Sequence, residues 1–135
     1  MKKIQLLIYG LLLSLLTVHA ADNTTRWHTY LAMYNTIAVA EAENNVYAVA
    51  DGTLYSYGKS DDNIRVYSRQ TGLSDSDVRL IRYNASTRTL VIAYANGNID
   101  LMTSDGIYNL PFLKNTTNIQ DKTLNAIDLS GDRAY

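Results

Sequence analysis

A strand, a tight turn and a second strand occur twice in this chain at a spacing of 45 residues. Shifting the sequence by that distance places Asp51-Gly52 on Asn96-Gly97, and the apolar run 46–50 on the apolar run 91–95. Asn-Gly and Asp-Gly pairs between strand-like runs are the strongest short-range hairpin signal, because a two-residue type I′ turn needs positive φ at both positions. Repeats of this length are typical of propeller blades, so the pattern predicts two copies of one blade.

Each copy is predicted to be a four-stranded antiparallel meander. The first blade spans about 36–67, with strands at 36–40, 46–50, 53–57 and 64–67. The second blade spans about 78–110, with strands at 78–83, 90–95, 98–103 and 107–110. The second strand of each copy is continuously apolar, as expected for an inner strand that neighbouring blades cover on both faces. The outermost strand of the first copy alternates, as expected for an edge that faces solvent.

The start of a third blade is expected at about 124–135, with a strand over 124–129. A closed propeller has at least four blades of about 45 residues each. The sequence therefore predicts an all-β fold, a partial β-propeller of about two and a half blades, that belongs to a longer protein. The isolated tetrad 27–30 has the pattern of the outermost strand, so we expect Trp27 and Tyr30 to lie in a ring-closing strand.

The first twenty residues have the three parts of a secretory signal peptide. Two lysines precede the apolar stretch 4–16, and the small-residue segment 18–20 resembles a cleavage site. We therefore expect cleavage before Ala21, export, and a mature domain over 21–135. A retained membrane anchor is disfavoured because the apolar stretch is too short to span a bilayer comfortably.

Composition narrows the possible partners. The 135 residues contain no cysteine, which removes both a disulfide framework and a lipoprotein anchor. The formal net charge is −1, and it becomes −3 without the two leader lysines. This mild acidity, with no basic cluster, argues against nucleic acid as a partner and against binding to an anionic membrane surface.

The residues offer little for catalysis or metal binding. His28 is the one histidine of the mature chain, so a nucleophile–base arrangement could be built only around it. We expect no catalytic residue, no cofactor and no enzymatic activity. The acidic clusters 61–63 and 75–77 lack the spacing of a calcium loop, so we expect them to cap turns and expect no metal site.

Tyrosines are numerous, and two interpretations stay open for them. Tyr55, Tyr57 and Tyr67 fall on the outer strands of the first blade and could form a surface on which sugars stack. Tyrosine also simply favours strands. The sequence does not choose between the two, and it identifies neither a ligand-binding face nor an oligomeric state.

The linker between the two blades resembles the repeat of the two-component-regulator propellers. Gly72-Leu73-Ser74-Asp75 is followed there by Val78 and Ile81, as in that repeat. The next strand, 90–94, departs from the Trp-Ile-Gly-Thr segment usual in that family. The resemblance implies, as our alternative, a periplasmic ligand-sensing domain of a hybrid two-component regulator. The predicted turn and repeat signature is Asp51, Gly52, Gly72, Leu73, Asn96 and Gly97.

A closer resemblance is to the N-terminal propellers of the PorZ family of the type IX secretion system in Bacteroidota. The segments that carry it are Trp27, 46–52, 72–75, 93–101 and 121–127. The resemblance implies a non-enzymatic surface component of the attachment complex, whose partners are a PorU-like sortase and anionic lipopolysaccharide, to which cargo is anchored. It implies a location at the outer-membrane surface or in the periplasm. A second propeller and a terminal sorting domain would favour this assignment, and a membrane span with a kinase would favour the regulator.

Overall fold

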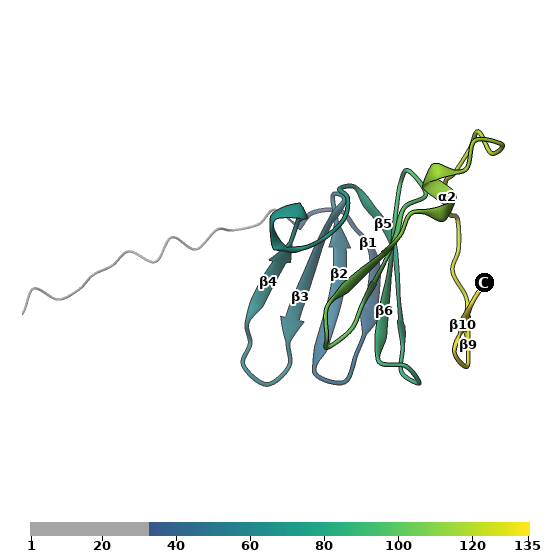
Figure 1. Cartoon of the computed structure of the whole chain (residues 1–135). Helices are drawn as coiled ribbons and strands as arrows, with labels where there is room; N and C mark the ends of the chain where they lie inside the picture. The colour runs from purple at the N-terminus through teal and green to yellow at the C-terminus, as the bar shows by residue number, and fades with distance from the viewer. Residues whose placement is uncertain (1–32) are drawn as a thin grey trace, which may run out of the picture. The chain divides into compact units, whose positions relative to one another are not determined.

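The computed structural model describes residues 33–135. These residues form two four-stranded antiparallel sheets, each a meander in chain order (Figure 1). The first sheet contains β1 (Thr36–Glu41), β2 (Asn45–Ala50), β3 (Thr53–Gly58) and β4 (Ile64–Tyr67). The second contains β5 (Val78–Asn84), β6 (Thr89–Tyr94), β7 (Ile99–Met102) and β8 (Ile107–Leu110). The predicted all-β, partial propeller fold is confirmed, with about two blades. The expected signal peptide and the tetrad 27–30 lie outside the described residues.

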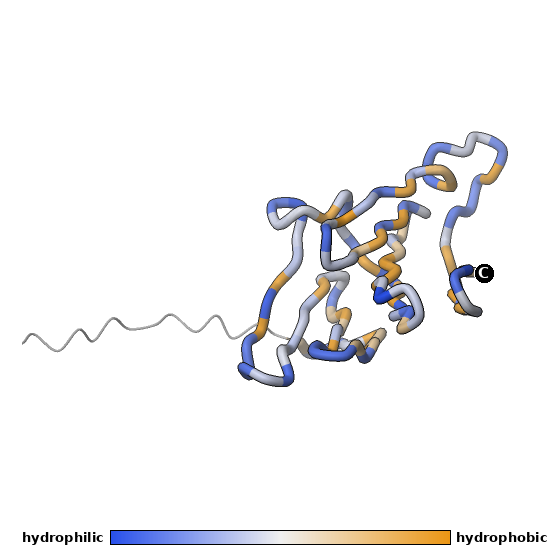
Figure 2. The backbone as a smooth tube through the Cα atoms, turned by 60° about the horizontal axis from the view of Figure 1, so that its bottom comes forward, coloured by the Kyte–Doolittle hydropathy of each residue, from blue (hydrophilic) through white to orange (hydrophobic). Residues whose placement is uncertain are grey.

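The two sheets share one hydrophobic core. Val49 and Leu54 are partners across β2 and β3, and Ile81 and Ile92 are partners across β5 and β6. All four side chains are 0% exposed and belong to a single cluster. Burying an aliphatic side chain of this size contributes about 1.5–3 kcal/mol, so the contact between the sheets contributes substantially to stability. Figure 2 shows that hydrophobic residues are concentrated in the strands and hydrophilic residues in the turns.

The first hairpin turn has the geometry that an Asp-Gly pair favours. Asp51 and Gly52 have φ of +49° and +74°, and the flanking residues Ala50 and Thr53 are paired in the ladder. Both turn residues are thus left-handed, as a two-residue type I′ turn requires.

The second hairpin turn differs from the predicted two-residue turn. The Tyr94 N–H donates to the Asn98 carbonyl at 3.0 Å, and the Gly97 N–H donates to the Tyr94 carbonyl at 3.1 Å. The loop therefore has three residues, of which only Gly97 has positive φ, +79°; this is a type I turn followed by a left-handed glycine. Asn96 does not have positive φ, and its side-chain oxygen accepts the Asn98 N–H at 3.0 Å.

One extra loop residue changes the register of the second sheet. Ile99 pairs with Ala93, and Asp100 pairs with Ile92, whereas the 45-residue repeat would place Ile99 opposite Tyr94. Because side chains alternate between faces, a shift of one residue exchanges the two faces of a strand. Asp100 therefore points into the core between the sheets.

The third unit is shorter than the predicted strand 124–129. The strands there are β9 (Leu129–Ser130) and β10 (Arg133–Ala134), which pair with each other. Residues 124–128 carry no strand, because a ladder needs a neighbouring backbone to exchange hydrogen bonds with. Ile127 is nevertheless 8% exposed, and it packs on the face of the second sheet that is turned away from the first.

Two short helices lie in the connections between sheets. The 3₁₀ helix η1 (Arg69–Thr71) follows β4, and α2 (Phe112–Asn115) follows β8. Within residues 33–135, neither helix has the length or the hydropathy needed to cross a bilayer.

Candidate functional site

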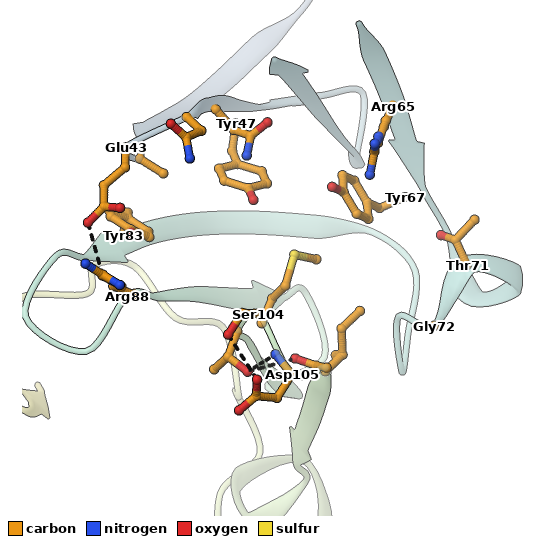
Figure 3. A pocket seen from close by; sticks show the side chains of 17 residues that line it. Glu43, Tyr47, Arg65, Tyr67, Thr71, Gly72, Tyr83, Arg88, Ser104 and Asp105 are labelled. Atoms are coloured by element: carbon orange, nitrogen blue, oxygen red, sulfur yellow. Dashed lines mark hydrogen bonds and ion pairs between the residues drawn. The ribbon is translucent and has the colours of Figure 1, made fainter. Parts of the chain in front are cut away.

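A cleft of about 810 Å³ opens between the two sheets (Figure 3). It continues the contact region beyond the hydrophobic core, toward the turns that join β1 to β2 and β7 to β8. Each wall of the cleft comes from one sheet, so neither blade alone could form it.

The wall formed by the first sheet is aromatic and carries an arginine. Tyr47, Ser56 and Arg65 are successive cross-strand partners on β2, β3 and β4, so their side chains share one face. The Tyr67 ring lies beside the Tyr47 ring, with centroids 6.3 Å apart and planes tilted by 46°. The hydroxyls of Tyr67 and Ser56 are hydrogen bonded at 3.2 Å. In Figure 3 both tyrosine rings project into the space between the sheets, with Arg65 next to Tyr67.

The ionisation of Tyr47 reflects this setting. Burial, followed by the proximity of the Tyr67 and Tyr83 hydroxyls, raises the pKa of Tyr47, while the nearby Arg65 charge acts in the opposite direction. Tyr47 is therefore a neutral hydroxyl at physiological pH, able to donate and to accept a hydrogen bond.

The opposite wall comes from the second sheet. Tyr83 on β5 is the cross-strand partner of Leu90 on β6, and Leu90 is in turn the partner of Met102 on β7. At one end of the cleft, Arg88 and Glu43 form an ion pair of 3.2 Å between the sheets. Their side chains are 75% and 55% exposed, and such pairs contribute little to stability. The pair limits the cleft at that end.

Among residues 33–135, Arg65 is the cation lining the cleft that forms no ion pair. Its side chain is exposed, and among residues 33–135 no carboxylate lies within ion-pair distance of it. A guanidinium group binds carboxylates and phosphates with two parallel hydrogen bonds. The cleft can therefore hold a polar ligand that carries a negative group.

Residues 33–135 contain neither histidine nor cysteine. The same range holds no group of three acidic, histidine or cysteine side chains arranged for a metal ion. The described part of the cleft thus has groups suited to binding, and it has no pair that resembles an activated nucleophile and its base.

The three tyrosines singled out from sequence do not share one face. Tyr67 pairs with Leu54 and lies on the core side, whereas Tyr55 and Tyr57 alternate to the other side of β3. Tyr57 donates a hydrogen bond to Asp62. The structure instead groups Tyr67 with Tyr47 and Tyr83, a combination that depends on pairing between strands and that the sequence analysis missed.

Gly72 and Leu73 have structural roles in the connection between the blades. Gly72 ends η1 with φ of +110°, a left-handed conformation that favours glycine, and it borders the cleft. Leu73 is 5% exposed and belongs to the core between the sheets.

The same connection contacts both hairpin turns. The Val78 N–H donates to the Gly52 carbonyl at 2.8 Å, and Asp75 accepts a hydrogen bond from the Asn96 side chain at 2.6 Å. Gly52 and Asn96, two residues of the predicted signature, are thus each hydrogen bonded to the connection between the blades. Gly72 is the member of the signature that lines the cleft.

Asp75 forms most of the side-chain hydrogen bonds between this connection and the rest of the second blade. Its Oδ2 accepts hydrogen bonds from Asn96 and from Lys114 Nζ, each at 2.6 Å, and its Oδ1 accepts the Ser76 N–H at 3.0 Å. Burial opposes ionisation, but the bonds from Asn96 and Lys114 outweigh it, so the pKa of Asp75 lies well below its usual range. Asp75 therefore links the two connections on either side of the second sheet.

Asp75→Asn is expected to lower the free energy of unfolding by about 1–2 kcal/mol at pH 7, because the ion pair with Lys114 is lost. A folded pKa below the unfolded value of about 3.9 gives stability that is complete above that value and is lost as the pH falls through the folded pKa. The difference between wild type and variant should therefore stay constant from about pH 7 to 5 and shrink in strong acid. Hydrogen exchange across this range measures it.

Asp77→Asn is the matched control, because its carboxylate is 52% exposed and pairs with Arg79 at the surface. Its effect should be below about 0.5 kcal/mol. Equal effects of the two variants, or a difference that vanishes already near pH 6, would show that the bonds of ionised Asp75 to Lys114 and Asn96 do not stabilise the fold.

The buried carboxylate of Asp100 is a further polar centre that sequence reasoning missed. Asp100 is 0% exposed and accepts hydrogen bonds from the Tyr94 hydroxyl, the Ser74 N–H at 2.8 Å and the Asn109 amide at 2.8 Å. Burial, and then the bond to Asp100, raises the pKa of Tyr94 far above its usual value. The alternation of polar and apolar residues over 98–101 predicts a half-exposed strand. Only the spacing of Asn96 and Asn98 indicates the longer loop that turns Asp100 inward.

Comparison with known proteins fits this geometry. The family model of the PorZ N-terminal β-propeller domain of the type IX secretion system matches residues 46–135. The chain belongs to this family. A comparison with curated proteins found no match.

Two solved structures resemble the chain. PorZ of Porphyromonas gingivalis is 42% identical, with a TM-score of 0.73 over 78% of this chain and 14% of that one. It is described as an essential bacterial surface component of the type IX secretion system. An extracellular domain assigned to a hybrid two-component system of B. thetaiotaomicron is 12% identical, with a TM-score of 0.56 over 69% of this chain and 12% of that one. The second likeness supports the fold alone.

Proposed function

We propose that this chain is part of the N-terminal propeller of a non-enzymatic surface component of the type IX secretion system. The observation that carries the proposal is the 42% identity to PorZ over 78% of the chain, together with membership of its propeller family. The cleft is consistent with it, because its described walls present an arginine and tyrosines suited to binding. A ligand-sensing role in a hybrid regulator has only a likeness of fold in its favour.

We further propose the specific role that the family resemblance implies. In this role the protein is exported by its signal peptide and lies at the outer-membrane surface. There it acts with a PorU-like sortase and helps exported cargo to be anchored to anionic lipopolysaccharide.

Deletion of the gene tests this role. We expect cargo proteins to be exported but left without their lipopolysaccharide anchor, and we expect the sortase to co-purify with a tagged copy of the protein. Restoring the wild-type gene should restore anchoring. Normal anchoring in the deletion strain would contradict the proposal, and a change confined to transcription would favour the sensor instead.

A further inference from the structure

We propose that the outer edge of β4 binds an extended segment of a partner protein, which adds a fifth strand to the first sheet. β4 (Ile64–Tyr67) ends that sheet, and within residues 33–135 β3 is the one strand that pairs with it (Figure 1). This interaction goes beyond the proposed function, because pairing through the backbone requires a polypeptide and involves no glycolipid.

The backbone of β4 directs N–H and carbonyl groups away from the sheet. The Gly58 N–H donates to the Asn63 carbonyl at 2.9 Å, so this pair occupies a hydrogen-bonded position of the β3–β4 ladder. Bonded and non-bonded positions alternate along an antiparallel ladder. Arg65 is therefore bonded to β3, whereas Ile64 and Val66 point their backbone groups outward. Outside the ladder, no backbone hydrogen bond of residues 33–135 uses these groups, and an edge of this kind is a template for strand addition.

The side chains beside this edge favour one pattern of residues in the added strand. Arg65 lies on the cleft side of the sheet, is exposed and forms no ion pair within the described range. Ile64 and Val66 alternate to the opposite face and are 52% and 39% exposed. A residue opposite Arg65 is in a non-hydrogen-bonded position, where Cα atoms are about 4.5 Å apart and facing side chains are close. An acidic residue there attracts Arg65, and apolar residues on either side of it cover Ile64 and Val66.

A second copy of this chain is a poor occupant of the edge. If two β4 edges pair around a two-fold axis so that Ile64 and Val66 both form their hydrogen bonds, each Arg65 faces its counterpart in the other copy. Like charges directly opposite each other are destabilising. The arginine therefore disfavours self-association through this edge, while it favours an acidic partner.

Binding of the labelled peptide Thr-Val-Glu-Val-Thr to the whole protein tests the inference. In antiparallel pairing its glutamate faces Arg65, and its valines exchange hydrogen bonds with Ile64 and Val66. Methylation of both valine nitrogens should weaken binding about tenfold or more, because these backbone hydrogen bonds are lost. Methylation of the glutamate nitrogen, which faces away from β4, is the matched control and should change binding less than about twofold. Fluorescence anisotropy measures both effects.

Reversing the charge of Arg65 tests the expected partner chemistry. Arg65→Glu should weaken binding of this peptide about fivefold or more, because an attractive cross-strand pair becomes repulsive. The peptide Thr-Val-Lys-Val-Thr should show the opposite preference and bind this variant more tightly than the wild type. Arg69→Glu makes the same charge change in η1, outside the strand, and should leave the preference between the peptides unchanged.

Three results would overturn the inference. Failure of every peptide to bind, or an equal loss when either set of nitrogens is methylated, would show that β4 does not accept a strand. An unchanged preference in Arg65→Glu would overturn the assignment of an acidic partner. We expect fast hydrogen exchange at Ile64 and Val66 that the peptide slows. Slow exchange there before peptide is added would show that another segment of the protein, or a second copy, already occupies the edge.

Discussion

Replacing Asp100 by alanine is expected to destabilise the second sheet by about 3–5 kcal/mol. The carboxylate is 0% exposed and accepts hydrogen bonds from Tyr94, Ser74 and Asn109. Removing it leaves the Tyr94 hydroxyl, whose residue is 0% exposed, and the part-buried Ser74 N–H without this acceptor, and each unsatisfied buried group costs about 1–3 kcal/mol. The exposed Asn109 amide keeps its bonds to the Asn98 side chain and to the Ile99 carbonyl. The effect is large because Asp100 joins β6, β8 and the connection between the blades.

Hydrogen exchange of the peptides that cover β6 and β7 measures this loss as faster exchange. Asp100→Asn should cost less, about 1–2 kcal/mol, because one amide oxygen can still accept from Tyr94 and Ser74. The exposed Asp132 offers a control, Asp132→Ala, which should leave exchange in both strands unchanged. If Asp100→Ala were as mild as this control, Asp100 would not lie at the centre of a buried network.

Gly97→Ala is expected to destabilise the hairpin of β6 and β7 by about 3 kcal/mol. Part of this comes from the φ of +79°, which costs an L-residue about 1–2 kcal/mol. The rest comes from crowding, because a Cβ at this position would lie 2.8 Å from the Lys122 Cβ and 3.0 Å from the Lys122 carbonyl oxygen. Forcing such contacts apart costs about 1–3 kcal/mol.

Gly131→Ala separates the two contributions. Gly131 also has positive φ, +60°, but a Cβ there would meet nothing within 4 Å. Its substitution should therefore cost only the backbone term, about 1–2 kcal/mol. Local unfolding measured by hydrogen exchange should show Gly97→Ala as clearly the more damaging of the two. Equal costs would mean that the segment containing Lys122 does not pack over the loop.

Local pattern was sufficient to predict the blades. Continuous apolar runs such as 46–50, alternation in Ile64–Tyr67 and the Asp51-Gly52 turn each report on a few neighbouring residues. These short-range signals fix which segments become strands and in what order they pair. The 45-residue repeat then indicated that one unit occurs twice, and the fold confirms a partial propeller of such units.

The register of the second sheet could not be predicted in the same way. The same Asx-Gly signal closes a two-residue loop at Gly52 and a three-residue loop at Gly97. The longer loop is accompanied by two contacts of the Asn96 side chain, a local one to the Asn98 N–H and a tertiary one to Asp75. A single residue in the loop therefore decides whether Asp100 faces solvent or the core.

The cleft was also beyond sequence reasoning. Tyr47, Tyr67 and Tyr83 meet because two sheets pack face to face, and their positions in the chain do not suggest it. Position in the chain instead places Tyr55 and Tyr57 with Tyr67 on the outer strands of the first blade. Alternation along β3 turns the first two to the other face.

An experimental structure of the whole protein is the most direct test of the central claim, that two neighbouring blades form an open binding cleft between them. We expect the sheets β1–β4 and β5–β8 to meet through Val49, Leu54, Ile81 and Ile92. We also expect the space between Tyr47 and Met102 to be open to solvent. Another segment of the protein filling that space, or a different element separating the two sheets, would contradict the account.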